Sequence, residues 1–226
     1  PTGGIARTKY DSVGNIIKTI DPVKYNEETD DGPGTEYTYD EMNRLIMIKD
    51  PDGNVQKKFI YDLDGNLVKE IDAKGYQSAA KDDKRFGTIY KYNLAGWLLE
   101  KRVPVDESSG KILYNITMYS YDKVGNRIEE KRSSEYVDEN SYPKVWNVIK
   151  YKHDKNGRII KISDSTGAQI EYEYDCLNNR TLEKVKISDT TSKITRYKYN
   201  SIGLLEKIIE EIDGDDLKLR VKGKTI

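Results

Sequence analysis

One short unit recurs eight times along the chain: an aromatic residue is followed directly by Asp or Asn, and Gly or Asn stands three places after that Asp or Asn. The aromatic anchors are Tyr10, Tyr39, Tyr61, Tyr92, Tyr121, His153, Tyr174 and Tyr199. The Gly or Asn positions are Gly14, Asn43, Gly65, Gly96, Gly125, Gly157, Asn178 and Gly203. Such recurrence indicates an internal repeat. We therefore expect residues 1–226 to form a single array of about eight repeats.

The unit has the chemistry of a β-hairpin. The residue two before the anchor is aromatic in seven cases, and alternate residues of a strand share a face, so Tyr119 and Tyr121 place two rings together. The Asp or Asn after the anchor bonds the backbone two residues on, and the Gly or Asn readily adopts positive φ. Together these features predict a strand, a short loop with a bulge, and a return strand.

A second turn separates one repeat from the next, as in Asp50–Asn54 and Asp164–Gly167. The distance between anchors varies, and we interpret the extra length as inserted loops between hairpins. These loops are expected at Asp21–Thr35, Ala73–Gly87, Pro104–Gly110, Ser133–Lys144 and Ser188–Ser192. Helical periodicity is absent, so about sixteen strands are predicted.

Composition favours a thin sheet. Tyr occurs 18 times and Phe 2 times, and a phenol combines an apolar ring with a hydroxyl that suits a partly wet surface. Charged residues alternate with apolar ones along strands, as in Glu171–Tyr174, so one face should be solvated. The aliphatic content is low for a chain of this length. The expected fold class is all-β: tandem hairpins in one continuous curved antiparallel sheet.

Charge and hydropathy exclude several classes of partner. Lys plus Arg number 38 and Asp plus Glu number 39, with both signs interspersed, so the chain lacks a basic surface for nucleic acid. No apolar run is long enough to span a membrane, and Pro1–Gly4 does not begin an export signal. Repeat-like sequence reaches both ends, so we expect a piece of a longer protein whose exposed strand edges allow weak self-association.

The segment Tyr119–Ile128, which reads YSYDKVGNRI, closely resembles the YD repeat of Rhs proteins. Similar repeats occur in the shell subunits of bacterial insecticidal toxin complexes and in animal teneurins. The resemblance covers almost the whole chain. It implies a segment of a spiral β-shell that encloses a C-terminal toxin or effector, and it leaves open which sheet face lines the interior. Asp213–Ile226 lacks the Pro-x-Gly-Arg type of processing box, so the self-cleavage of many members is not carried over.

Candidate chemistry is sparse. His153 is the only histidine and occupies an anchor position that Tyr fills elsewhere, so we expect a structural role and no catalytic triad. Cys176 is the only cysteine, which excludes an internal disulfide and a Cys-rich metal site. Turns such as Asp62–Asn66 resemble the start of a calcium loop but lack its closing Glu, and they leave calcium open. We predict no catalytic residue, no metal site and no cofactor.

Two functions remain from different classes. The leading interpretation is a structural encapsulation module, part of an Rhs-type shell whose partners are an effector domain and further YD repeats. The alternative is a cell-surface or wall-associated module that binds carbohydrate or protein, with Trp97 and Trp146 as candidate sugar-stacking residues. An enzyme is not expected. Either function implies a secreted or surface location in bacteria, with export as part of a longer protein.

Overall fold

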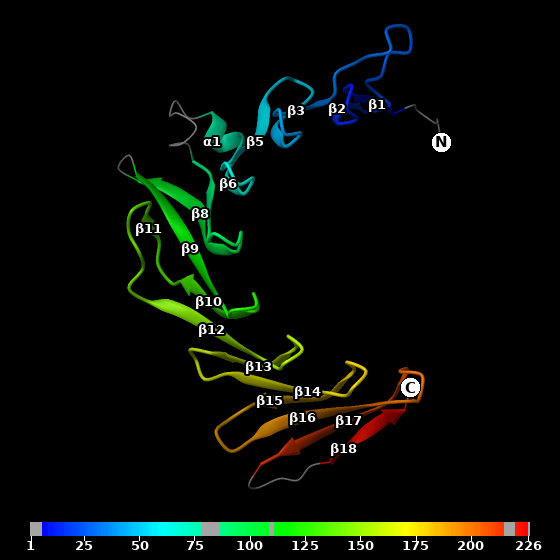
Figure 1. Ribbon diagram of the computed structural model, residues 1–226, viewed down its shortest axis with the longest axis vertical. Helices are drawn as coiled ribbons and strands as arrows, with labels where there is room; N and C mark the ends of the chain where they lie inside the picture. Colours follow the sequence, from blue (N-terminus) through cyan, green and yellow to red (C-terminus); the bar gives the residue numbers. More distant parts are fainter. Residues whose placement is uncertain (1–5, 78–85, 109–110, 215–219, 226) are drawn as a thin grey trace. The chain divides into compact units, whose positions relative to one another are not determined.

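The computed structural model describes residues 6–77, 86–108, 111–214 and 220–225. These residues form antiparallel hairpins with one short helix, which confirms the predicted all-β class (Figure 1). The sheet has 18 strands, two more than expected, in the described part of the chain. The additional strands are β11 (Val137–Asp138) and β18 (Arg220–Thr225), neither of which belongs to a YD hairpin.

The chain divides into two compact units, one of Pro1–Ile116 with Tyr136–Tyr142 and one of Thr117–Glu135 with Pro143–Ile226. Besides β11, the first unit contains β1 (Arg7–Tyr10), β2 (Ile16–Ile20), β3 (Thr35–Tyr39), β4 (Leu45–Lys49), β5 (Val55–Tyr61), β6 (Leu67–Asp72), α1 (Ala73–Tyr76), β7 (Thr88–Tyr92) and β8 (Leu98–Ser108). Besides β18, the second contains β10 (Arg127–Ser133), β12 (Trp146–His153), β13 (Ile159–Asp164), β14 (Gln169–Tyr174), β15 (Arg180–Lys186), β16 (Ser192–Tyr199) and β17 (Leu205–Asp213). Strand β9 (Lys111–Tyr121) contributes residues to both.

Figure 1 shows each unit as a single layer of hairpins. In the first unit, β1 to β8 pair in chain order, and β11 pairs with Leu113 and Tyr114 of β9. In the second, β10 lies between β9 and β12, and β12 to β18 pair in chain order. The register shifts just before the anchor in hairpins such as β5–β6, between Ile60 and Tyr61, as a bulge at the turn requires.

The inserted segments bury the best-covered apolar side chains of the first unit. Ile20, Ile71 and Tyr114 are at most 2% exposed, and each lies beside an inserted segment. Close approach explains two glycines there: a Cβ at Gly34 would overlap the Thr19 carbonyl oxygen, and one at Gly75 would overlap that of Phe86. The insertions therefore supply a local core that a single layer of sheet lacks.

Three expected insertions differ in form from open loops, and one of them, Ser133–Lys144, contains β11. Asp72 caps the one-turn helix α1 by accepting a hydrogen bond from Gly75 N–H (2.8 Å), so Ala73–Tyr76 are helical. Pro104 to Ser108 continue β8, because branched residues such as Val103 and Val105 extend the hairpin before it turns. Residues 78–85 and 109–110 of these insertions lie outside the described residues.

Candidate functional site

All YD turns share one backbone geometry. The eight Gly or Asn positions have positive φ, from 59° at Asn43 to 96° at Gly14. In the fifth turn, Asp122 Oδ1 accepts hydrogen bonds from the backbone N–H groups of Val124 (3.0 Å) and Asn126 (2.9 Å). An Asx turn that ends in a left-handed residue reverses the chain within a few residues. Each anchor is thereby held at the end of its strand.

The second carboxylate oxygen of the turn Asp has a partner that the sequence reasoning did not identify. In six turns the residue four after the Asp donates a side-chain hydrogen bond to Oδ2 at 2.7 to 3.0 Å. The pairs are Asp11 with Asn15, Asp40 with Arg44, Asp62 with Asn66, Asp122 with Asn126, Asp154 with Arg158, and Asp175 with Asn179. In the two turns that begin with Asn, the same position holds Trp97 or Leu204. The amide nitrogen of these Asn residues cannot accept a hydrogen bond, so it does not replace the second carboxylate oxygen of Asp.

These hydrogen bonds favour the ionised form of the turn acids. The Asn126 side chain lowers the pKa of Asp122, although partial burial acts in the opposite direction. At Asp154, burial raises the pKa, but the side-chain and backbone hydrogen bonds from Arg158 outweigh it, and the net shift is downward. The turn carboxylates are thus anionic acceptors and are poor proton donors at neutral pH.

The anchor tyrosines bond one repeat to the one before it. In the described part of the chain, five anchor phenols each donate a hydrogen bond of 2.9 to 3.0 Å to the carbonyl of the first residue in the preceding return strand. The pairs are Tyr39 with Ile16, Tyr61 with Leu45, Tyr92 with Leu67, Tyr174 with Ile159, and Tyr199 with Arg180. The rings therefore act as staples between neighbouring hairpins, in addition to the strand pairing.

His153 occupies the anchor position at the end of β12. By the pattern of the other repeats, its partner would be the carbonyl of Arg127, the first residue of β10. The shorter imidazole makes no such bond among the described residues, and its Nδ1 is buried without a partner. The neighbouring acid, Asp154, is bonded to Arg158. His153 is therefore a substituted repeat position, and no described nucleophile is bonded to it.

The most buried charged cluster lies in the first unit, under a segment that we call the strap, Tyr136–Tyr142. Arg102 is 1% exposed; its Nε donates to Glu100 Oε1 (2.5 Å), and Nη1 donates to the carbonyls of Asp138, Glu139 and Ser141 in the strap. The Tyr142 hydroxyl donates to Glu100 Oε2 (2.9 Å), and its ring centroid lies 4.8 Å from the guanidinium. The cluster therefore fastens the strap to β8.

The electrostatics of this cluster oppose proton transfer. Burial raises the pKa of Glu100, but hydrogen bonds from Arg102, Lys91 and Tyr142 outweigh it and the net shift is downward. Burial, and then the charge of Glu139, raise the pKa of Tyr114 to about 12. The Tyr114 hydroxyl is buried without a hydrogen-bond partner among the described residues. Glu100, a charge-paired acid, and Tyr114, a neutral phenol, therefore stabilise the structure and are unsuited to acid–base catalysis near neutral pH.

Trp97 and Trp146 are both half-buried, and they belong to different units. Cys176 is exposed in the seventh YD turn, next to Leu177, which is 65% exposed. The structure brings none of these three residues together with His153 in a described contact.

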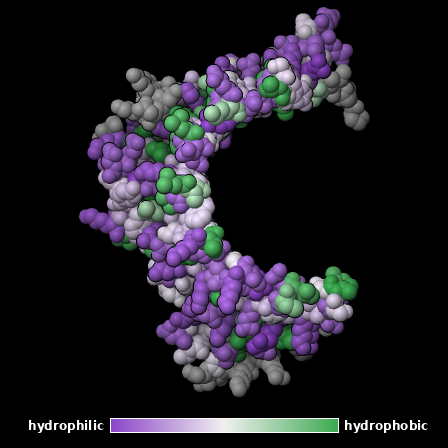
Figure 2. Space-filling model, in the orientation of Figure 1, coloured by the Kyte–Doolittle hydropathy of each residue, from purple (hydrophilic) through white to green (hydrophobic). Residues whose placement is uncertain are grey.

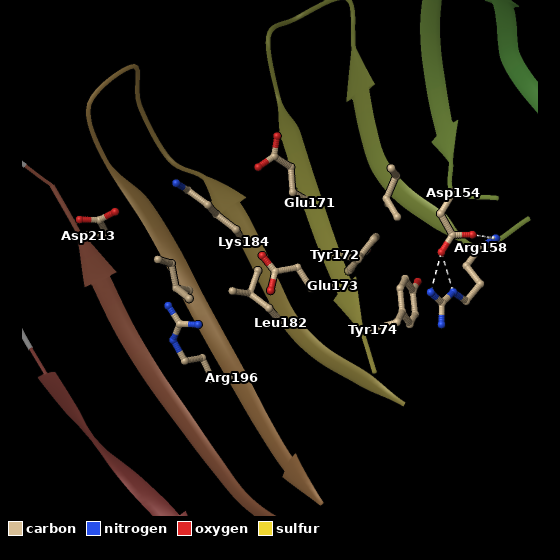
Figure 3. A pocket seen from close by; sticks show the side chains of 12 residues that line it. Asp154, Arg158, Glu171, Tyr172, Glu173, Tyr174, Leu182, Lys184, Arg196 and Asp213 are labelled. Carbon is tan, nitrogen blue, oxygen red and sulfur yellow. Dashed lines mark hydrogen bonds and ion pairs between the residues drawn. The ribbon is translucent and has the colours of Figure 1, made fainter. Parts of the chain in front are cut away.

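Strands β13 to β17 of the second unit border an open groove of about 790 Å³ (Figure 3). Its lining mixes charges with two tyrosines, and the labelled side chains include Glu171, Tyr172, Tyr174 and Arg196. Two of these charged side chains are paired: Glu171 contacts Lys161 at 3.2 Å and Arg196 contacts Glu211 at 3.7 Å. We find no set of three or more His, Cys, Asp or Glu side chains placed to hold a metal ion among the described residues. Likewise, no helix in that part of the chain has the length and hydropathy needed to cross a bilayer.

Comparisons with known proteins gave matches to solved structures only. No family model and no curated protein matches the sequence. The crystal structure of TcdB2-TccC3-Cdc42 has 13% identity and a TM-score of 0.40, covering 98% of this chain and 13% of that chain. The Photorhabdus luminescens Tc holotoxin pore with a TccC3 mutation has 14% identity and a TM-score of 0.39, covering 95% and 12%. TcdB2-TccC3 without its hypervariable C-terminal region has 13% identity and a TM-score of 0.40, covering 95% and 12%. This chain is thus similar to about an eighth of each of these much longer chains.

Proposed function

We propose that this chain is a structural segment of an Rhs-type shell that encloses a toxin or effector domain. The observation that carries the proposal is the bonding between repeats. Five anchor tyrosines are bonded to the preceding hairpin, as Tyr61 is to Leu45, and turn side chains such as Arg44 reach the next turn at Asp62. Units bonded in this way extend a wall by simple addition, without needing a central core.

In this role the chain acts mechanically and sterically. Its partners are the enclosed effector and further YD repeats, and the wall keeps the effector from the producing cell. The protein is exported from a bacterium as part of a longer polypeptide and works outside the cell. The task requires strand pairing and rigid turns, and it requires no catalytic group or cofactor.

The test is protease protection in the complete polypeptide that the gene encodes. Ile60→Pro removes a ladder hydrogen bond from β5, which is paired on both sides, and should open the wall there. Leu63→Ser, in a fully exposed turn position, is the matched control. We expect an effector domain that resists protease in the parent and in the control but is digested in Ile60→Pro. Equal digestion of that domain in all three proteins would contradict enclosure.

The alternative function, carbohydrate binding at a cell surface, depends on Trp97 and Trp146. Their partial burial gives each ring at most a limited area for sugar stacking. A glycan array decides the matter: binding that is lost in Trp97→Ala or Trp146→Ala, with the fold intact by circular dichroism, would favour this function over enclosure.

A further inference from the structure

Three YD hairpins place two lysines directly opposite each other, just before the turn. The cross-strand pairs are Lys9 with Lys18, Lys152 with Lys161, and Lys198 with Lys207. In each pair, which we call a lysine pair, one lysine precedes the anchor and the other lies four places after the left-handed Gly. Like charges that face each other across two strands destabilise a sheet, so an anion beside each pair is favourable.

The hairpin does not require lysine at these two positions. The fourth hairpin has Lys91 opposite Glu100, and the two side chains form an ion pair at 3.0 Å. The third hairpin has Ile60 opposite Lys69. The geometry therefore accepts an acid or an apolar residue there, and the repulsion within a lysine pair is not a consequence of the fold.

The first lysine pair shows which group such a pair binds. Asp31, in the segment inserted between β2 and β3, has its Oδ1 at 3.1 Å from the Nζ atoms of both Lys9 and Lys18. A backbone bond from Gly32 and then the two lysines lower the pKa of Asp31, so this carboxylate is ionised at neutral pH. The inserted segment is acidic, since residues 26–31 read NEETDD. One carboxylate of an acidic segment thus bridges the two lysines.

The other two pairs differ in how far an acid neutralises them. At the second pair, Glu171 of β14 contacts Lys161 at 3.2 Å. At the third pair, Lys198 is exposed and Lys207 is half-buried, and neither contacts an acid among the described residues. The adjoining acid, Glu206, is exposed and pairs with neither lysine. The third pair therefore has the geometry of the first, with no acid from the described part of the chain.

The neighbours of the third pair leave its positive charge uncompensated. Arg196 lies two residues before Lys198 on the same face of β16, and it contacts Glu211 at 3.7 Å. On the other side, β18 brings Thr225, which carries no charge, opposite Lys207. The second unit is mostly hydrophilic in the view of Figure 2. Recognition at this site therefore depends on charge more than on apolar contact.

We propose that Lys198 and Lys207 form a binding site for an aspartate or glutamate side chain of an acidic polypeptide segment. The carboxylate lies between the two ammonium groups, as that of Asp31 does in the first hairpin. Exposed ion pairs are individually weak, so a segment within the same polypeptide, at high effective concentration, fits the site better than a free anion. For the source of that segment the inference rests on the proposed function: it is either an inserted segment of another repeat or the effector domain.

A peptide titration tests the site in the 226-residue chain at low salt. The probe is a fluorescent peptide with the sequence of residues 25–34, YNEETDDGPG, and the control peptide carries amides in place of its four acids. We expect weak binding of the acidic peptide only. Lys198→Gln with Lys207→Gln should weaken this binding at least about threefold, the loss of two exposed ion pairs. The matched control, Lys123→Gln with Lys155→Gln in exposed turns, should bind as the parent does.

Three results of the titration would overturn the proposal. The first is the absence of binding to the parent chain at millimolar peptide. The second is equal binding to the parent and to the variant of the third lysine pair. The third is an equal loss in the turn-lysine control, which would assign the binding to net charge alone.

Carbodiimide cross-linking of the complete polypeptide identifies the source of the segment. The reagent activates a carboxylate, and a lysine amine in contact displaces the activated group to form an amide. Asp31 with Lys9 or Lys18 is the internal positive control. We expect Lys198 or Lys207 to be joined to an acid other than Glu206, and the mass of the joined peptide assigns that acid to another repeat or to the effector.

The two proposals can fail separately. Cross-links at the first lysine pair with none at the third would overturn the binding site and leave effector enclosure standing, because enclosure is measured by protease protection. A cross-link from the third pair to another repeat would support the site even in a polypeptide whose effector domain is digested.

Discussion

At the scale of single residues, the turn Asp and the residue four places later act as a pair. The Asp brings two acceptor oxygens, one for backbone N–H groups and one for the side chain of Asn or Arg. Turns that begin with Asn keep the backbone bonds, as Asn93 does with Ala95 (3.0 Å) and Trp97 (2.9 Å), but offer no second acceptor. Four places after the Asn, these turns hold Trp97 or Leu204 in place of the Asn or Arg that follows Asp. The pairing rule therefore follows from donor and acceptor chemistry alone.

The pair predicts a defined dependence of stability on pH. The folded pKa of Asp122 lies below its unfolded value near ~3.9, so its contribution is present above that pH and is lost as pH falls through the folded pKa. Asp122→Asn should lower the urea midpoint at neutral pH and flatten its fall on acidification. Adding Asn126→Leu should recover part of the neutral-pH loss, because the pair then matches Asn200 with Leu204. Parallel acid profiles for parent and Asp122→Asn would refute this.

The left-handed turn position predicts a graded response to substitution. Gly96 has φ of 76°, and the nearest atom to an added Cβ would be 3.7 Å away, so only the backbone resists a side chain. Gly96→Val should cost about 1–2 kcal/mol, since a branched residue is strained there. Gly96→Asn should cost less, as Asn43 and Asn178 adopt the same conformation. Urea unfolding measures both, and equal midpoints for the two variants would mean that φ strain is not the cause.

Residue chemistry could be predicted from the sequence where it is local. The Asx turn and the positive φ follow from the residues of one turn. Asn43 and Gly96 have the expected positive φ in the structure. The tyrosine staples could not be predicted, because they join residues 15 to 25 positions apart whose register depends on the bulge. The bond to the second carboxylate oxygen has a signal in the sequence, because in six turns the Asp is followed four places later by Asn or Arg.

At the scale of elements, the tyrosine staples add side-chain bonds to strand pairing. A hairpin alone is marginally stable in water, so bonds that join successive hairpins matter for each of them. Tyr61 and Tyr174 donate across the boundary between repeats, at 2.9 Å each. His153 interrupts this series, and its Nδ1 is buried without a partner among the described residues, so the boundary between β10 and β12 lacks this added bond.

The interrupted staple predicts a stabilising substitution. His153→Tyr places a hydroxyl where it can bond the Arg127 carbonyl and should raise stability by about 1 kcal/mol, the usual net value of one hydrogen bond. His153→Phe is the control, because it fills the position without the hydroxyl. The complementary variant Tyr61→Phe should lose about the same amount. Thermal or urea unfolding would contradict the staple if His153→Tyr and His153→Phe had equal stability.

The strap shows why identical local sequence can have different structural roles. Glu100-Lys101-Arg102 and Glu130-Lys131-Arg132 are the same tripeptide, and in both the Arg Nε bonds the Glu carboxylate. The Arg132 side chain is 62% exposed, whereas that of Arg102 is 1% exposed beneath the strap. Removing Arg102 leaves Glu100 in a buried site and three strap carbonyls without their donor.

We therefore predict a large difference between two equivalent substitutions. Arg102→Met should cost about 3–5 kcal/mol, the range for breaking a buried ion pair. Arg132→Met should cost less than Arg102→Met, because Arg132 itself is exposed and Arg127 still pairs with the buried Glu130 at 3.1 Å. Limited proteolysis should also cut within Tyr136–Tyr142 faster in Arg102→Met than in Arg132→Met. Equal stability and equal cleavage in the two variants would show that the strap is held by other contacts.

The positions of the hairpin strands could be predicted from the sequence, but the packing of the inserted segments could not. The alternating pattern and the turn residues place the eight hairpins in the sequence, and eight hairpins account for all strands except β11 and β18. Insertions were expected as loops, but α1, β11 and the extension of β8 give them structure. Their contacts, such as Arg102 with the strap, join residues more than 35 positions apart, and no local pattern specifies that pairing.

At the scale of the whole molecule, the array is close to one-dimensional. Each strand contacts its neighbours in the sheet, and stability then depends on the number of neighbours that each hairpin has. Strand β1 pairs only with β2, and β18 only with β17, within the described residues. Strands β5 and β14 have a partner on each side. Local opening should therefore be easier at both ends of the array than within it.

Amide hydrogen exchange tests this gradient. Amides of β1 and β18 should exchange at least about tenfold faster than those of β5 and β14, because opening an end hairpin breaks one interface and opening an inner one breaks two. Raising the protein concentration should slow exchange in β1 and β18 if unpaired edges also associate, as expected for a weak edge-to-edge contact. Exchange measured at low protein concentration provides the control, because edge-to-edge association is then weakest. Uniform exchange across all four strands at low concentration would show that the chain opens as one cooperative unit, and the one-dimensional description would then be wrong.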